Sequence, residues 1–201
     1  MGTNDELGEL AAAPAILDLR NYVQYYDGAL TPEFSAQLVS AFEQSARLQV
    51  ANGRGHQAGL DTSSWTEVNV TPLADTAFIG FFHAQIDKYL AEYNRKIPLT
   101  LPIPNRPTID DLRIKRYRAG SGDNFQPHFD SIDQKCGRYL VFLWYLNDVA
   151  EGGETEFVDI GIKVAPRAGR LLMFPPYWMF QHAGRPPISN DKYIISTYLM
   201  F

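Results

Sequence analysis

Three residues of this sequence, two histidines and one aspartate, have the types and spacing of metal ligands. His128 and Asp130 are separated by a single residue, so on a β-strand both side chains would point to one face, about 7 Å apart along the backbone. His182 lies well downstream in a second apolar segment and can supply a third ligand. Two histidines and one carboxylate leave coordination positions open, an arrangement typical of non-haem Fe(II) sites.

A His-x-Asp pair occurs often by chance, and either of these histidines alone could be an ordinary polar residue. The other two histidines favour that simpler interpretation, because His56 lies in a glycine-rich segment and His83 in a predicted helix. The metal prediction therefore depends on the elements and motifs that surround the three candidate ligands.

The first half of the chain predicts two helices. Thr31 followed by Pro32, and Thr71 followed by Pro72, are helix-start signals, and apolar residues recur at helical spacing after each pair. Between the two predicted helices, residues 51–65 are rich in glycine and typical of a lid or a binding loop.

From Asp110 onward the pattern changes to short β-type segments separated by glycine-containing turns. Residues 139–146 are almost wholly apolar, as expected for a strand that is covered on both faces. The predicted strands are 112–118, 125–130, 138–147, 155–159, 161–165, 170–174, 179–183 and 192–201.

Strands of this number and spacing are typical of a sandwich or a jelly-roll barrel. The predicted fold class is therefore α+β, with a double-stranded β-helix (jelly-roll) core and N-terminal helices packed on one sheet. We expect residues 1–14 to be a mobile leader and residues 15–201 to form a single domain. Within it, residues 15–108 would supply the helical support and the lid, and residues 109–201 the jelly roll with the metal site.

Composition excludes some classes of partner. The chain has 201 residues, 45% of them hydrophobic, and a net charge of −5, so it has material for a core but no general attraction for nucleic acid or for an anionic membrane. No apolar run approaches the length needed to span a bilayer. A single cysteine, Cys136, and an N-terminus without a signal peptide indicate a cytoplasmic protein.

Several motifs around the candidate ligands resemble those of one enzyme family. Over residues 112–201 the sequence is similar to the prolyl 4-hydroxylase branch of the iron/2-oxoglutarate oxygenases. The motifs that carry this resemblance are Arg116-Tyr117, Gly120, Phe125-Gln126-Pro127-His128-Phe129-Asp130, Tyr145-Leu146-Asn147-Asp148, Gly152-Gly153-Glu154-Thr155, Phe157, Pro166, Gly169, Phe174, His182-Ala183-Gly184 and Lys192.

The resemblance implies Fe(II) bound by His128, Asp130 and His182, with 2-oxoglutarate as cosubstrate and ascorbate as a reductant. Alternation along the last strand places Lys192 on one face with apolar neighbours, where a lone cation would need an anionic partner. In the family this position binds the distal carboxylate of 2-oxoglutarate.

By the same resemblance, Tyr145, Tyr117 and Thr155 line the cosubstrate site. Both tyrosines could also be core residues with their hydroxyl groups at the rim.

The implied reaction is hydroxylation of a C–H bond with release of succinate and CO2. A peptidyl proline is the leading substrate, with Phe125 and Trp178 as candidate substrate contacts, although Trp178 could equally belong to the barrel core. Two alternatives stay open, namely a hydroxylase of a free amino acid or small metabolite, and a barrel that binds a metal or a ligand without catalysis.

Overall fold

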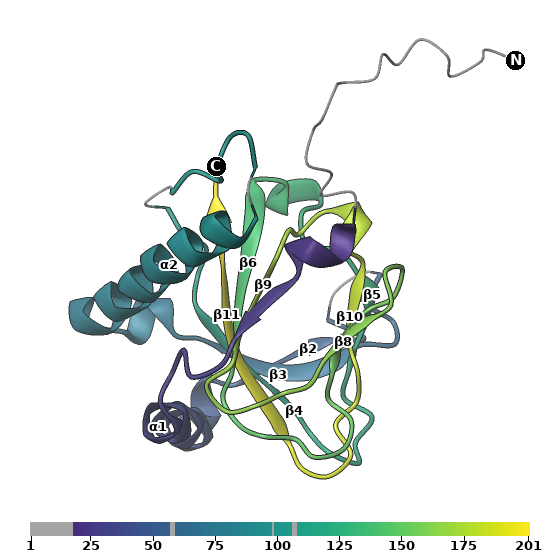
Figure 1. Ribbon diagram of the computed structural model, residues 1–201. Coiled ribbons are helices and arrows are strands. Elements are labelled where there is room, and N and C mark those ends of the chain that lie inside the picture. Colours follow the sequence, from purple (N-terminus) through teal and green to yellow (C-terminus); the bar gives the residue numbers. More distant parts are fainter. Residues whose placement is uncertain (1–17, 57–58, 98, 106–107) are drawn as a thin grey trace, which may run out of the picture.

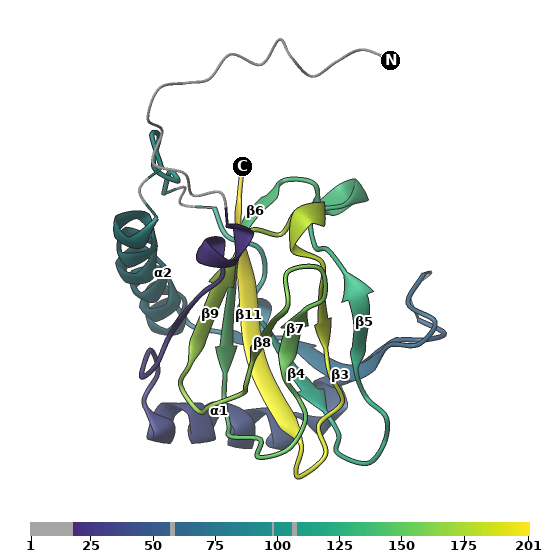
Figure 2. The same ribbon diagram turned by 45° about the vertical axis from the view of Figure 1, so that its right-hand side comes forward.

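Two antiparallel β-sheets face each other in the computed structural model, which describes residues 18–56, 59–97, 99–105 and 108–201 (Figures 1 and 2). The larger sheet has seven strands in the order β1 (Gln24–Tyr26), β9 (Leu171–Phe174), β6 (Arg138–Tyr145), β11 (Lys192–Met200), β4 (Arg113–Tyr117), β3 (Ser64–Asn69) and β2 (Val50–Gly53). The smaller sheet has the order β5 (Phe125–His128), β10 (His182–Gly184), β7 (Thr155–Phe157) and β8 (Ile162–Val164).

The central strand β6 is buried along its whole length because both of its faces are covered. Leu143 and Tyr145 belong to the apolar cluster between the two sheets. Phe142 and Trp144 belong to a second cluster that also contains residues of the helices. The prediction of a strand covered on both faces is thus confirmed.

Helix α2 (Thr76–Lys96) lies against the outer face of the seven-stranded sheet, opposite the smaller sheet (Figure 2). Phe82 of this helix meets the Trp144 ring edge-on at 5.1 Å between centroids. Helix α1 (Pro32–Gln44) contributes Leu38 and Phe42 to the same cluster. The two helices therefore bury apolar stripes against the side of the sheet that is remote from the candidate metal ligands.

Helix α1 begins where the sequence predicts, but helix α2 does not. The Thr31 hydroxyl accepts a hydrogen bond from the Phe34 N–H at 3.2 Å and caps α1. Helix α2 begins at Thr76 and is capped by Asp75, whereas the predicted start, Thr71, opens the short 3-10 helix η3 (Thr71–Leu73).

The reason for this difference is that Thr71 has another partner. Its hydroxyl accepts a hydrogen bond from the Leu112 N–H at 2.8 Å, and the Asp75 carboxylate accepts one from the Phe78 N–H at 2.8 Å.

The described part of residues 15–108 contributes three strands in addition to the two predicted helices. Strands β1, β2 and β3 extend the larger sheet at its two edges. Strands β2 and β3 form a hairpin, and the segment 51–65 that was expected to be a lid or binding loop covers most of β2, the connection and the start of β3. Residues 57 and 58 of this segment, and the predicted leader 1–14, lie outside the described residues.

A glycine makes the β2–β3 hairpin possible. Gly53 has a φ of +90°, and a Cβ atom there would lie 2.4 Å from the Ser63 carbonyl oxygen.

In the described part of the chain, no helix is both long enough and apolar enough to cross a membrane.

The other strands agree with the sequence to within a few residues, with one exception at His182. The predicted strand 179–183 is instead the 3-10 helix η5 (Trp178–Phe180) followed by β10, which starts at His182. Two further short helices, η1 (Leu19–Tyr22) and η4 (Asp133–Lys135), precede β1 and β6, and η2 (Ala46–Leu48) follows α1.

Candidate metal centre and adjoining pocket

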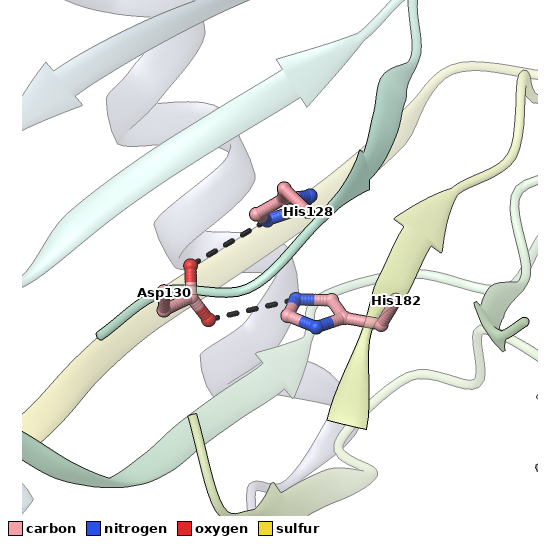
Figure 3. A group of neighbouring side chains, drawn as sticks. All are labelled: His128, Asp130 and His182. Carbon is pink, nitrogen blue, oxygen red and sulfur yellow. Dashed lines mark ion pairs between the residues drawn. The ribbon is translucent and has the colours of Figure 1, made fainter. Parts of the chain in front are cut away.

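His128, Asp130 and His182 meet at one end of the smaller sheet (Figure 3). His128 ends β5 and His182 begins β10, and these two residues are direct partners in the antiparallel pairing. The Asp130 carboxylate lies between the two rings, with one oxygen 3.5 Å from His128 Nε2 and the other 3.5 Å from His182 Nε2. One ligand atom from each residue lies within 4.8 Å of the others, so the three side chains could hold a single ion.

Both histidines present the same nitrogen to this centre because the backbone fixes the other one. His128 Nδ1 lies 2.8 Å from the Gln126 carbonyl oxygen, and His182 Nδ1 lies 3.1 Å from the Phe180 carbonyl oxygen. A carbonyl can only accept, so each Nδ1 carries the proton and each Nε2 keeps a free lone pair. Backbone acceptors of this kind orient histidine ligands in metal sites.

Asp130 does not lie on the strand, contrary to the prediction of strand 125–130. Strand β5 ends at His128, and the N–H groups of Asp130 and Ser131 both donate to the Pro176 carbonyl oxygen at 3.0 Å. The carboxylate therefore reaches the histidines from a turn that is tied to the segment after β9.

The electrostatics of the centre keep two of its ligands ready to coordinate. Burial alone would raise the pKa of Asp130, but His182 and His128 outweigh it and hold that pKa well below its usual range. Burial, together with His128, lowers the pKa of His182 to about 4, although Asp130 opposes the shift. At neutral pH the centre therefore offers a carboxylate and a neutral imidazole, the protonation states that a divalent metal requires.

A narrow pocket runs from these ligands into the space between the two sheets. Alternate residues of β4 and β11 face inward along one wall, and residues of both sheets complete the lining. The residues that line it are Lys115, Tyr117, Phe125, His128, Asp130, Val141, Leu143, Thr155, Phe174, His182, Gly184, Lys192, Ile194, Ser196 and Tyr198.

Lys192 is a buried cation in this pocket, with 2% of its surface exposed. Its ammonium lies 5.2 Å from the centre of the Tyr117 ring and 5.6 Å from that of the Tyr145 ring. Among the described residues, no carboxylate lies within ion-pair distance of it. Burial, with a smaller contribution from Lys115, lowers its pKa to about 7, although Glu154 opposes the shift. A buried ammonium in this environment fits an anionic ligand.

The three other predicted cosubstrate residues surround Lys192. Tyr117 is its cross-strand partner on β4, and Thr155 lines the same pocket. The buried hydroxyl of Tyr145 donates to the Thr155 hydroxyl at 2.7 Å, so it supports the pocket wall through Thr155. Burial raises the pKa values of Tyr117 and Tyr145 well above their ordinary value, and both phenols stay protonated.

The two predicted substrate contacts differ in their position. Phe125 lines the pocket and stacks on His128 at 3.6 Å between ring centroids. Trp178 lies on η5 with 67% of its surface exposed, and it is not among the residues that line the pocket. The alternative that Trp178 belongs to the barrel core is therefore wrong.

Sequence reasoning missed Lys115, which lines the pocket near Asp130. A signal for it was present, because Lys115 lies two residues before Tyr117 on a predicted strand and alternation places the two on one face.

Comparison with known proteins identifies the region that forms this pocket. Residues 112–200 match the family model of the 2OG-Fe(II) oxygenase superfamily. The chain carries a 2OG-Fe(II) oxygenase domain of the prolyl 4-hydroxylase-like kind. This domain contains the three candidate ligands, Lys192 and every strand of the smaller sheet.

Relatives of the oxygenase domain agree in sequence and in fold. The chain is 30% identical over 172 residues to a probable prolyl 4-hydroxylase 11 of Arabidopsis thaliana, a match that covers 80% of this chain and 54% of that protein. The chain thus spans about half the length of this curated relative.

Two solved structures show the same fold. A prolyl hydroxylase from Trichoplax adhaerens, in complex with a peptide fragment of the hypoxia inducible factor oxygen degradation domain, superposes with a TM-score of 0.69 at 18% identity, over 90% of this chain and 84% of that one. A viral collagen prolyl hydroxylase from Paramecium Bursaria Chlorella virus-1, in a 2OG complex, gives 0.60 at 20% identity, over 88% and 94% of the two chains.

Proposed function

We propose that this chain is an Fe(II)- and 2-oxoglutarate-dependent dioxygenase that hydroxylates a peptidyl proline and releases succinate and CO2. The observation that carries the proposal is the position of Lys192. It is a buried cation without an ion-pair partner among the described residues, and it lies in the same pocket as two histidines and a carboxylate.

The residues of the pocket fit both Fe(II) and 2-oxoglutarate. Two imidazole nitrogens and one carboxylate oxygen form a donor set that suits Fe(II) and leaves positions open for a chelating cosubstrate and for dioxygen. We assign the metal to His128, Asp130 and His182, and the distal carboxylate of 2-oxoglutarate to Lys192. Tyr117 and Thr155 complete the wall around that carboxylate, and Tyr145 holds the Thr155 hydroxyl in place.

When bound, Fe(II) and 2-oxoglutarate supply the oxidising chemistry, in which one atom of dioxygen enters succinate and the other enters the C–H bond of the substrate. The protein supplies orientation and a dry pocket. Backbone carbonyls hold the two imidazole rings, and the stacked Phe125 ring covers His128. No side-chain acid or base is assigned a proton-transfer step.

The order of the strands supports the finer assignment of the fold. From β4 to β11, the larger sheet receives β4, β6, β9 and β11 and the smaller sheet receives β5, β7, β8 and β10. We infer that these eight strands form the double-stranded β-helix, that α1 and α2 support its outer face, and that residues 15–201 form a single domain.

The cytoplasmic location of the protein stays a prediction.

A peptide substrate is supported by the relatives. The solved Trichoplax relative holds a peptide, and the Arabidopsis relative is described as a prolyl 4-hydroxylase. In this chain, Phe125 lies at the pocket in a position to contact the substrate, and the exposed Trp178 is the second predicted contact.

Hydroxylation of proline peptides tests the proposal. The purified protein, supplied with Fe(II), 2-oxoglutarate and air, should add one oxygen atom to proline in a peptide panel, as located by tandem mass spectrometry. Lys192→Met should lose this activity at limiting 2-oxoglutarate. Lys163→Met, on an exposed lysine of β8, should keep it. Oxygen addition only to free amino acids would contradict the peptidyl substrate.

A further inference from the structure

A polar hollow adjoins the metal pocket, and Lys115 lies where the two meet. The hollow and the pocket share five residues, among them Lys115, Asp130 and Tyr198. Lys192 lines the pocket but not the hollow. The hollow, here called the outer hollow, is lined by Asn52, Trp65, Glu67, Asp110, Asp111, Arg113, Lys115, Phe125, Asp130, Gln134, Lys135, Arg138, Ser196, Tyr198 and Met200. A substrate that approaches the metal through the outer hollow would pass Lys115.

The two arginines of the outer hollow already have carboxylate partners. Arg113 contacts Glu67 at 3.4 Å and Asp111 at 3.1 Å. Arg138 donates from Nε to Asp110 at 2.9 Å. The positive charges of these side chains are therefore matched by the protein itself.

Lys115 has no such partner among the described residues. Its ammonium lies 5.5 Å from the centre of the Trp65 ring and 5.7 Å from that of the Phe125 ring, and no carboxylate is within ion-pair distance. Aromatic faces stabilise an ammonium less than a charge-assisted hydrogen bond to a carboxylate does. Lys115 is thus a half-buried cation that faces a substrate path with an unused hydrogen-bonding capacity.

We propose that Lys115 binds a carboxylate of the primary substrate, so that the enzyme takes substrates that carry an anionic group next to the hydroxylated residue. This inference rests on the Fe(II)- and 2-oxoglutarate-dependent oxygenase part of the proposed function, not on its peptidyl substrate, and adds the substrate class. The carboxylate can come from a free amino acid or from an acidic side chain of a peptide, and both sources present the same chemistry to the ammonium.

The two lysines have separate roles because the register of the strands sets them apart. Lys192 on β11 pairs with Tyr117 on β4, whereas Lys115 on β4 pairs with Ile194 on β11. The second pair lies two residues away from the first on each strand. Two residues correspond to about 7 Å of strand. Lys192 therefore marks the inner end of the pocket for the cosubstrate, and Lys115 marks the end that opens toward the substrate.

Asp130 cannot serve as the permanent partner of Lys115. Its two carboxylate oxygens lie 3.5 Å from the Nε2 atoms of the two histidines, where they complete the donor set. Glu67 is also engaged, because it accepts a hydrogen bond from Trp65 Nε1 at 2.6 Å and contacts Arg113. A substrate carboxylate is the remaining candidate.

Matched substrate pairs test this proposal. The first pair is L-proline and L-prolinamide, and the second is two blocked peptides that differ only by Glu or Gln beside the target proline. We expect kcat/KM to be about tenfold higher for the carboxylate member of one pair, and that pair identifies the source of the carboxylate. Binding of both members to the Fe(II)- and 2-oxoglutarate-loaded enzyme without oxygen gives a second measure.

Variants then connect the preference to Lys115. Lys115→Met should reduce the ratio of kcat/KM between the carboxylate substrate and its neutral partner to about one. Lys115→Arg should keep the preference for the carboxylate substrate. The matched control is Lys88→Met, which removes the same charge from the exposed side of α2 and should behave as the wild type. The ratio is independent of any general loss of activity in a variant.

The outcomes separate this inference from the proposed function. Absence of succinate in the wild type, with or without substrate, would mean that the oxygenase function itself fails. Succinate formation without any carboxylate preference, in turnover and in binding, would overturn only the role of Lys115. A preference that persists in Lys115→Met, or a variant that loses only affinity for 2-oxoglutarate, would overturn it as well.

Discussion

His182 is the direct cross-strand partner of His128, and the two imidazole rings lie 4.3 Å apart between centroids. The antiparallel pairing of β5 with β10 thus brings together two residues that lie far apart in the sequence. Asp130 comes to the same place from the turn after β5, held by the Pro176 carbonyl oxygen. The metal centre therefore depends on strand pairing as much as on its three ligands.

Removal of one histidine should abolish stable iron binding. His182→Ala leaves one nitrogen and one carboxylate oxygen, so we expect Fe(II) affinity to fall by at least about 100-fold. The iron content of the purified variant, measured by mass spectrometry of the metal, checks this, with circular dichroism to verify the fold. His83→Ala on α2 is the control. Equal iron content in His182→Ala and wild type would contradict the assignment.

Replacement of Lys192 should affect the cosubstrate and leave the metal in place. Loss of a charge-assisted hydrogen bond costs about 1.5–3 kcal/mol, so Lys192→Met should weaken 2-oxoglutarate binding by roughly 10- to 100-fold. Titration of 2-oxoglutarate into the Fe(II) form without oxygen measures this. Loss of iron together with 2-oxoglutarate, to the extent seen in His182→Ala, would show that Lys192 has a different role.

Binding of 2-oxoglutarate should weaken as the pH rises. The pKa of Lys192 is lowered to about 7, so the ammonium is charged below that pH and loses its proton above it. A carboxylate ligand needs the charged form, and affinity should therefore fall by about tenfold for each pH unit well above 7. Lys192→Arg should flatten this dependence because arginine stays charged. An affinity that increases with pH would contradict the role of the ammonium.

The same lysine should destabilise the protein when no cosubstrate is present. Its folded-state pKa lies below its unfolded value, so the energetic penalty is fully present below about pH 7 and decreases as the pH rises toward the unfolded value. Lys192→Met should raise the free energy of unfolding by at least about 1 kcal/mol at pH 6 and by less at pH 9. Urea unfolding at the two pH values checks the sign. A variant that is less stable at pH 6 would contradict it.

Local signals in the sequence were sufficient for much of the fold. The cap and proline at Thr31 and Pro32 correctly predicted the start of α1, because capping acts over a few residues. Alternation along β11 correctly placed Lys192 on one face of the strand, and Ile194, Ser196 and Tyr198 line the pocket on that same face, because strand geometry fixes which face each residue occupies.

Long-range partners were the part that local signals could not supply. Thr71 looks like a helix cap but bonds to Leu112, which lies on a distant segment. Strands β1 to β3 were missed because each is stabilised mainly by a sheet neighbour rather than by its own pattern, as in the pairing of Gln24 with Met173. The proposed role of Lys115 was missed because the charges that surround it, in the described part of the chain, become visible only when the walls of the outer hollow are assembled.

Succinate formation from 2-oxoglutarate is the most direct test of the central claim. The wild-type protein with Fe(II) under air should convert 2-oxoglutarate to succinate and CO2 in equal amounts, even slowly without a primary substrate, and removal of iron or dioxygen should stop the reaction. His182→Ala should form none. Stable iron binding at His128, Asp130 and His182 without any succinate, in the presence or absence of proline peptides, would contradict the oxygenase assignment.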